Sequence, residues 1–237
     1  MRRRRRVHGT AGLMVLLTAI AGWVDAVAYV RSGQVFVANQ TGNAVFLAVQ
    51  IAEHMFPASA RAHAVHLAVS GDTYGPLASL LGFCLGVAAS VLPLRRSRRA
   101  GDDSAPWMLL VLEALLLASV VLLAGTPREI RLGLAAAAMG VQSVYAAGVA
   151  MRGVTTTTLT GTLVALISAF ADDPGRQARK AIALLTAVWI AYTVGAWGGA
   201  AAGLTWSIGT VHGCAALAAA AAAFAVWRDR HPSRPGV

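Results

Sequence analysis

The chain has 237 residues, of which 57% are hydrophobic and 13% are charged, and its mean hydropathy is +0.63. A soluble domain of this length does not reach such values, so the composition excludes an ordinary water-soluble protein. The formal net charge of +10 would suit nucleic-acid binding, but the basic residues form short blocks beside apolar runs, which is typical of a membrane protein.

Apolar runs long enough to cross a bilayer recur along the chain. About 20 apolar residues in a helix cross roughly 30 Å of hydrocarbon. Two weaker apolar segments, 34–51 and 154–171, carry polar clusters and are expected to be broken or re-entrant. We therefore predict an all-α polytopic transmembrane bundle with about six full spans, forming a single integral membrane domain over 1–237. The predicted full spans are 9–30, 74–94, 105–125, 130–151, 181–203 and 206–227.

The first predicted span carries an acidic residue, Asp25. A carboxylate within a membrane is costly, which makes it a candidate for handling a solute or a proton. The alternative is structural, with Asp25 accepting hydrogen bonds that orient the polar loop after the helix. Arg31 lies about one and a half turns further on and on a different helical face, so we do not expect it to be the partner of Asp25.

The stretch "VFVANQTGNAVF" at 35–46 places polar residues and glycine side by side within an apolar segment. Irregular backbone at membrane depth is tolerated where it lines a cavity. We predict that Thr-Gly-Asn at 41–43 and Thr-Gly-Thr at 160–162 are paired helix breaks that lie near each other. Gly42 and Gly161 would then allow close backbone approach. The residues predicted to line a solute path are Asp25, Asn39, Gln40, Thr41, Gly42, Asn43, Gln142, Thr160, Gly161 and Thr162.

Several other residue types suggest little chemistry. His54, His63 and His66 fall in a loop without the carboxylates or cysteines of a metal site, and Cys84 and Cys214 fall within predicted helices. Thr155 to Thr158 suit either a hydroxyl-lined path or bonds to their own helix backbone. We predict no metal, no cofactor and no nucleic-acid partner, and no catalytic motif indicates an enzyme.

Glu113 lies near the middle of the predicted 105–125 helix. Burial favours its protonated form, which suits a proton relay or a neutral hydrogen bond between helices. We favour the structural role, because this helix appears in neither repeat described next.

Two internal repeats are predicted. The segment 21–49 resembles 139–167, and each is followed by a span with paired glycines. This places repeat 1 at about 11–94 and repeat 2 at about 130–203, joined by a connecting helix at 105–125 and followed by a final helix at 206–227. Gln142 and Ser143 stand where the first repeat has Asp25. The glycines expected at close helix contacts are Gly82, Gly86, Gly195 and Gly199, with the first pair matched to the second.

The charge distribution predicts the topology. With six spans, every basic block lies on one side, and the positive-inside rule makes that side cytoplasmic, together with both termini. With eight crossings, the block at 95–99 would lie outside. In the six-span arrangement the two repeats have inverted orientations. The blocks lie at 2–6, 95–99, 176–180 and 228–234.

The segments "GWVDAVAYV", "GQVFVANQTGN", "MGVQS" and "TTTTLTGTL" resemble the signature segments of the YoaK family of bacterial membrane proteins, a domain of unknown function. The likeness covers about 11–227. It implies a location in the bacterial cytoplasmic (inner) membrane and implies no particular activity.

The leading functional hypothesis is a small-solute transporter or channel with the polar breaks near its path. A membrane scaffold that binds partner helices through glycine-rich faces is the main alternative, and an intramembrane enzyme acting on a lipid-linked substrate is the second. The expected partners are the lipid bilayer and an unidentified small solute, and a homo-oligomer stays open.

Overall fold

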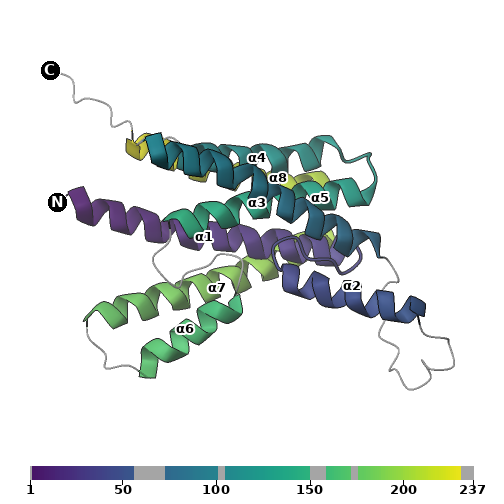
Figure 1. Ribbon diagram of the computed structural model, residues 1–237, viewed down its shortest axis with the longest axis horizontal. Coiled ribbons are helices and arrows are strands. Elements are labelled where there is room, and N and C mark those ends of the chain that lie inside the picture. The colour runs from purple at the N-terminus through teal and green to yellow at the C-terminus, as the bar shows by residue number, and fades with distance from the viewer. Residues whose placement is uncertain (1, 56–72, 101–104, 150–158, 172–175, 231–237) are drawn as a thin grey trace.

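A computed structural model describes residues 2–55, 73–100, 105–149, 159–171 and 176–230. The described residues form eight α-helices and no strands, which confirms the all-α prediction (Figure 1). The helices are α1 (Arg2–Arg31), α2 (Gln40–Met55), α3 (Tyr74–Ala100), α4 (Ala105–Leu122), α5 (Arg128–Val149), α6 (Leu159–Ala171), α7 (Arg176–Thr205) and α8 (Ile208–Arg230).

Six of these helices run lengthwise through a common bundle. Helices α1, α4 and α7 run in one direction, and α3, α5 and α8 run in the other (Figure 1). Five of the six are long and apolar enough to cross a membrane, and α4 contributes a shorter apolar helix, Trp107–Leu122. Because α2 and α6 are not among these candidate spans, the fold matches a polytopic bundle with two additional shorter helical segments.

The described parts of the basic blocks gather at one end of the bundle. The starts of α1 and α7 and the ends of α3 and α8 all lie there (Figure 1). Since α1 and α3 are antiparallel, the arrangement has six crossings, because eight crossings would make these two helices parallel. Residues 231–234 of the last block lie outside the described residues.

Helices α1 and α7 pack along each other in the same direction through small residues. A β-carbon built on Gly195 would overlap the backbone of Ala19, and one on Gly199 would overlap the backbone of Trp23. The backbones therefore approach closely enough that only glycine fits at these two positions. Both predicted packing glycines of the second repeat thus lie at this crossing.

Helices α3 and α5 make the corresponding contact, which also joins one predicted repeat to the other. A β-carbon on Gly82 would overlap the backbone of Gly133, and one on Gly86 would overlap that of Ala137. Both predicted glycines of this pair also lie at a helix crossing, which brings the two predicted repeats together along two glycine-lined seams.

The glycine pairs are nevertheless shifted by about one helical turn from the matching predicted from the sequence. Gly86 contacts Ala137 and Gly195 contacts Ala19, and the aligned segments place Ala19 and Ala137 at matching positions. Gly86 is therefore equivalent to Gly195, and the prediction that Gly82 is its counterpart is wrong. Sequence matching aligned the two glycine pairs in order, whereas the contacts make only Gly86 and Gly195 of these four glycines equivalent.

The remaining contacts also occur in matched sets. Helix α2 packs on α3 as α6 packs on α7, and α4 packs on α5 as α8 packs on α1. Helices α4 and α8 pack against each other. Helix α4, predicted as a connector, therefore packs on the first helix of the second repeat as α8 packs on the first helix of the first repeat.

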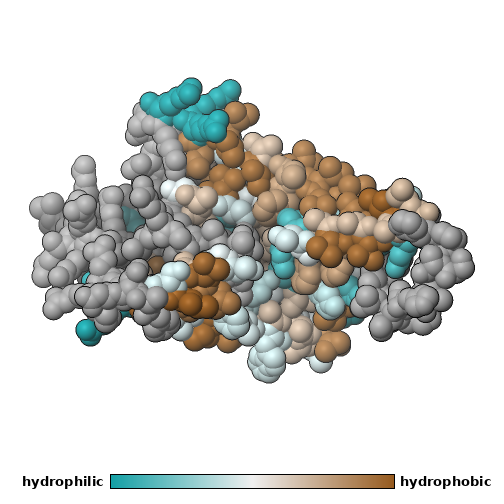
Figure 2. Space-filling view, turned by 60° about the horizontal axis from the view of Figure 1, so that its bottom comes forward, coloured by the Kyte–Doolittle hydropathy of each residue, from teal (hydrophilic) through white to brown (hydrophobic). Residues whose placement is uncertain are grey.

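The surface of the described bundle suits a lipid solvent. Hydrophobic residues cover much of the face shown in Figure 2. Large apolar side chains such as Leu85, Leu115 and Trp197 are more than half exposed. A water-soluble fold rarely exposes so continuous an apolar surface, whereas a bilayer accepts it.

Candidate functional site

The chain reverses direction directly after α1. The amide of Ser32 donates to the carbonyl of Ala28 at 2.8 Å, and that of Gln34 donates to Tyr29 at 3.1 Å, which closes the end of the helix. Gly33 and Gln34 have φ angles of 77° and 62°. Two consecutive residues in the left-handed region end the helix and turn the chain back toward the bundle.

Asp25 holds the returning segment. Its Oδ1 accepts hydrogen bonds from the amides of Val37 at 2.7 Å and Ala38 at 2.6 Å. Its Oδ2 accepts one from the hydroxyl of Tyr192 on α7 at 2.6 Å. Asp25 lies six residues before the end of α1 at Arg31, so the backbone of 32–39 returns by about 9 Å along the helix. The segment is re-entrant, and Asp25 joins it to two helices.

The carboxyl group of Asp25 is almost completely removed from the surface, with 2% of the residue exposed. Three donors satisfy its two oxygens, which stabilises a buried polar group that would otherwise be costly. This geometry is the structural alternative considered from the sequence, in which Asp25 orients the following loop.

Arg31 also lies at this end of the bundle but takes a separate partner. Its guanidinium donates to the carbonyl of Trp206 at 2.5 Å, at the connection between α7 and α8. As expected from its helical face, it does not pair with Asp25. It instead ties the end of α1 to the end of α7.

A second group of hydrogen bonds fixes the start of α2. The side chain of Asn43 accepts from the amide of Phe36 at 2.9 Å and donates to the carbonyl of Phe36 at 2.6 Å. The hydroxyl of Ser79 on α3 donates to the same carbonyl at 2.7 Å. Gln40 donates to the carbonyl of Val37 at 2.8 Å. Polar side chains within the membrane segment therefore satisfy the irregular backbone before α2, as burial in lipid requires.

The ring of Phe36 fills the space inside this turn. It stacks on Tyr29 at a centroid distance of 5.3 Å and on Phe46 at 6.0 Å. A β-carbon on Gly42 would come within 2.8 Å of the Phe36 ring. A larger residue at position 42 would therefore overlap the Phe36 ring of the same segment unless the ring moved.

The two predicted helix breaks lie at the starts of α2 and α6. Among the described residues, α2 packs on α3 and α6 packs on α7, and the two short helices do not pack on each other. A β-carbon on Gly161 would have open space around it. Among the described residues, the expected close backbone approach at Gly42 and Gly161 is therefore wrong, because Gly42 lies against the Phe36 ring of its own segment and Gly161 has no close neighbour. That the two breaks lie near each other stays a prediction.

The other predicted path residues are distributed over several elements. Thr41 and Thr160 are exposed and Asn39 is half-buried, whereas Thr162 is fully buried. The Gln142 amide nitrogen donates to the carbonyl of Leu17 at 3.0 Å and so joins α5 to α1. The side chain of His54, and His63, His66 and Thr155 to Thr158, lie outside the described residues.

Glu113 is fully buried on the face of α4 that also carries the buried Leu110 and Leu117. Neither of its carboxyl oxygens has a hydrogen-bond partner among the described residues. The Gln142 side-chain oxygen is likewise buried without a partner in that part of the chain. These polar groups lie within the apolar core and make no hydrogen bond to the described part of the re-entrant segment through these oxygens.

The sequence analysis missed Tyr192 and Ser79. Each stands three residues before a packing glycine, Gly195 or Gly82, and therefore on the same side of its helix. That spacing is the signal that could have found them, since a hydroxyl on a glycine seam points toward the neighbouring helix.

Comparison with known proteins gives a consistent family assignment. The family model described as "Protein of unknown function (DUF1275)" matches residues 13–226. The UPF0700 transmembrane protein YoaK of Bacillus subtilis (strain 168) is 32% identical over 168 residues, which are 69% of this chain and 67% of that protein. No solved structure matches the chain. The family match includes the whole re-entrant segment and both glycine seams.

Proposed function

The chain belongs to the DUF1275 family of membrane proteins, as its resemblance to YoaK predicted, and we propose that it is a small-solute transporter or channel of the bacterial cytoplasmic membrane. Its membrane nature follows from the apolar helices and the transmembrane relative. The transport function is our inference from the architecture.

The observation that carries the proposal is the pair of short helices that run toward opposite ends of the bundle (Figure 1). Helix α2 runs away from the re-entrant segment toward the end without basic blocks, and α6 runs toward the basic end (Figure 1). Their contacts with α3 and α7 correspond. Many transporters are built from two inverted repeats with interrupted helices near the substrate site, and this arrangement supports such a relation here.

We further propose that the basic end is cytoplasmic, with both termini, because short cytoplasmic loops carry most of the lysine and arginine in membrane proteins. The test is cysteine labelling in intact cells, in a variant with Cys84 and Cys214 replaced by alanine. Ser97→Cys at the basic end should resist an impermeant maleimide, and Thr126→Cys at the other end should react. The reverse labelling pattern would contradict the orientation.

In this proposal the re-entrant segment shapes one wall of the path. Asp25 and Asn43 use their polar atoms to hold the backbone, so solute contact is left to the more exposed groups around Thr41 and Asn39. The two residues act as positioning residues for the segment.

The decisive experiment is a flux assay with purified protein in liposomes. Osmotic swelling would be followed with a panel of glycerol, urea, neutral amino acids and monocarboxylates, against protein-free liposomes. We expect protein-dependent entry of at least one class, reduced in the Asn43→Ala variant and retained in Gly161→Ala. Swelling equal to protein-free liposomes for every solute, from correctly folded protein, would argue against transport of these classes.

A membrane scaffold is the second candidate, and one observation favours it. The polar groups of Asp25 and Asn43 are satisfied within the protein, which is what a region with a purely structural role would show. Leu163, Val164 and Ile167 of α6 also expose apolar side chains that a partner helix could cover. Crosslinking from cysteines on this face, with no flux in any assay, would favour the scaffold.

A further inference from the structure

We propose that a groove between α4 and α8 binds one acyl chain of an anionic phospholipid, with the headgroup beside arginines at the basic end of the bundle. The groove is lined by side chains of the two helices and has a volume of about 480 Å³. The proposal uses only the bundle and does not depend on transport. The lining residues are Trp107, Val111, Ala114, Leu115, Ala220, Ala223, Phe224 and Trp227.

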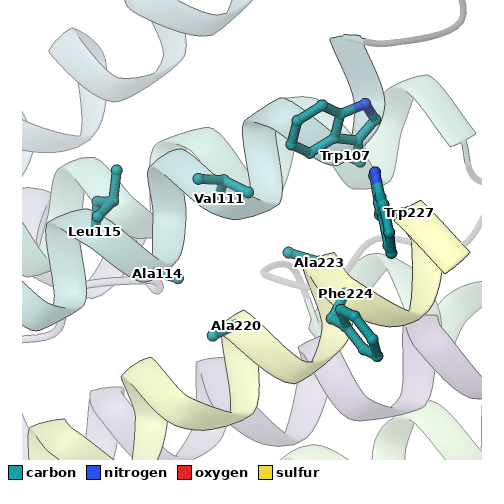
Figure 3. A pocket seen from close by; sticks show the side chains of 8 residues that line it. All are labelled: Trp107, Val111, Ala114, Leu115, Ala220, Ala223, Phe224 and Trp227. Carbon is teal, nitrogen blue, oxygen red and sulfur yellow. The ribbon is translucent and has the colours of Figure 1, made fainter.

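The shape of the groove suits a chain that lies along the bundle. From Trp107 to Leu115 it follows α4 for two helical turns, or about 12 Å. The antiparallel α8 supplies the facing wall, from Trp227 back to Ala220. Alanines form the floor where a larger side chain would fill the space, as Figure 3 shows for Ala114, Ala220 and Ala223. The groove is therefore narrow, elongated and parallel to lipid chains.

Two tryptophans mark one end of the groove. The rings of Trp107 and Trp227 converge from α4 and α8, while Leu115 lies at the far end (Figure 3). Tryptophan is enriched at the level of the lipid headgroups, where its ring is in an apolar layer and its N–H can reach polar groups. This end is therefore the place for the ester and headgroup region of a bound lipid.

The charge around that end selects an anionic lipid. Trp227 is followed directly by the exposed Arg228, and the end of α3, with the exposed Arg95, Arg96 and Arg99, lies at the same end of the bundle (Figure 1). Asp229 is also exposed there and opposes this charge in part. Arginine is suited to phosphate because its planar fork donates two parallel hydrogen bonds. Among the described residues at this end, basic groups outnumber the acid, which favours a negatively charged headgroup over a zwitterionic one.

The test compares phosphatidylglycerol with phosphatidylcholine of the same acyl chains. Native mass spectrometry of the full-length protein in detergent would measure the retention of each lipid. We expect phosphatidylglycerol to be retained more strongly, and the Arg228→Gln variant to weaken its binding about fivefold, as expected for one arginine near a lipid surface. Lys180→Gln, at the same end but on α7, is the matched control and should change binding little.

A second pair of variants tests the groove itself. Ala220→Leu should displace the acyl chain, whereas Ala221→Leu, on the exposed neighbouring position outside the lining, should not. Brominated phosphatidylglycerol in liposomes quenches the fluorescence of nearby tryptophans, and the Trp227→Phe variant shows how much of the quenching comes from Trp227. We expect Ala220→Leu to reduce this contribution of Trp227. Equal retention of the two lipids would overturn the headgroup assignment. Unchanged phosphatidylglycerol binding in Ala220→Leu would overturn the acyl-chain site. It would also be overturned if the protein formed a dimer that this variant lost, because a second copy of the chain would then cover the groove.

Discussion

The two predicted repeats differ in how they hold the chain beside the glycine-lined crossing of the helices. In the first half, Asp25 joins α1, the re-entrant segment and Tyr192 of α7. In the second half, the matching Ser143 bonds to the carbonyl of Met139 in its own helix at 2.8 Å. The position that corresponds to Tyr192 by the seam contacts is Phe83 of α3, which has no hydroxyl. The glycine-lined seams are similar, whereas among these matched positions only the first half has a carboxylate that accepts hydrogen bonds from two elements.

This difference shows which constraint governs each region. Glycines are required where backbones touch, so Gly86 and Gly195 recur at equivalent crossings in both halves. The hydrogen-bonding side chains answer a local need, namely an irregular backbone buried beside α1, and they change where that need changes. The first half is therefore the place to disturb the re-entrant segment without disturbing the seams.

The largest effect is expected at a seam. In Gly195→Leu the side chain would overlap the backbone of Ala19, which cannot move aside as a flexible side chain would. We expect a loss of more than about 3 kcal/mol of stability or a failure to fold. Thermal unfolding in detergent would measure it. Gly161→Leu is the control, since that position has open space and should stay within about 0.5 kcal/mol of the unsubstituted chain. Equal losses in the two variants would contradict the seam argument.

The next effect separates the two halves directly. Asp25→Ala would leave the buried amides of Val37 and Ala38 and the Tyr192 hydroxyl without their acceptor, at a cost of about 3 kcal/mol or more. The hydroxyl of Ser143 bonds to a carbonyl of its own helix, and Ser143→Ala should cost less than Asp25→Ala because it leaves no set of three donors without an acceptor. The measurement is the unfolding temperature of both variants, together with maleimide labelling of Val37→Cys in each background. Similar losses would show that the difference between the halves is not energetic.

The sequence predicted the class of fold well because the solvent imposes it. Runs of apolar residues and blocks of arginine indicate spans and their directions. The described parts of the weak segments at 34–51 and 154–171 contain the short helices α2 and α6, which are not among the candidate spans. The prediction that Gly82 and Gly86 are packing positions rested on the rule that small residues allow helices to touch. Both glycines lie directly against the backbone of α5.

The parts that could not be predicted concern which groups meet across sequence distance. The sequence left two interpretations of Asp25 open, a role with a solute or proton and a structural role. Nothing in the sequence shows that the chain turns back at Gly33 and Gln34, so that two backbone amides donate to Asp25. Asn43 was expected to line a solute path, and nothing in the sequence shows that its side chain bonds to both backbone groups of Phe36. Local hydrogen bonds of this kind leave little periodic signal.

The hydroxyl of Tyr192 tests how far Asp25 depends on α7. Tyr192→Phe removes one donor to the carboxylate and leaves the two amide bonds, so we expect a loss of about 1.5 to 3 kcal/mol. A double-mutant cycle with Asp25→Asn should give a coupling free energy of at least about 1 kcal/mol, because the two groups contact directly. Additive losses in this cycle would mean that the bond contributes little to the folded state.

The smallest effect is expected at Thr162, which holds the position in the second half that Asn43 holds in the first. Thr162 is fully buried, and Thr162→Ser keeps its hydroxyl while removing one methyl group. The expected cost is about 0.8 kcal/mol, the free energy of burying one such group. Asn43→Ser, in contrast, loses the amide that both donates to and accepts from Phe36 and should cost about 2 kcal/mol. Both variants would be compared by unfolding temperature in the same detergent. If Thr162→Ser were the more damaging of the two, the second half would hold a polar contact as demanding as the first, and the contrast between the halves would fail.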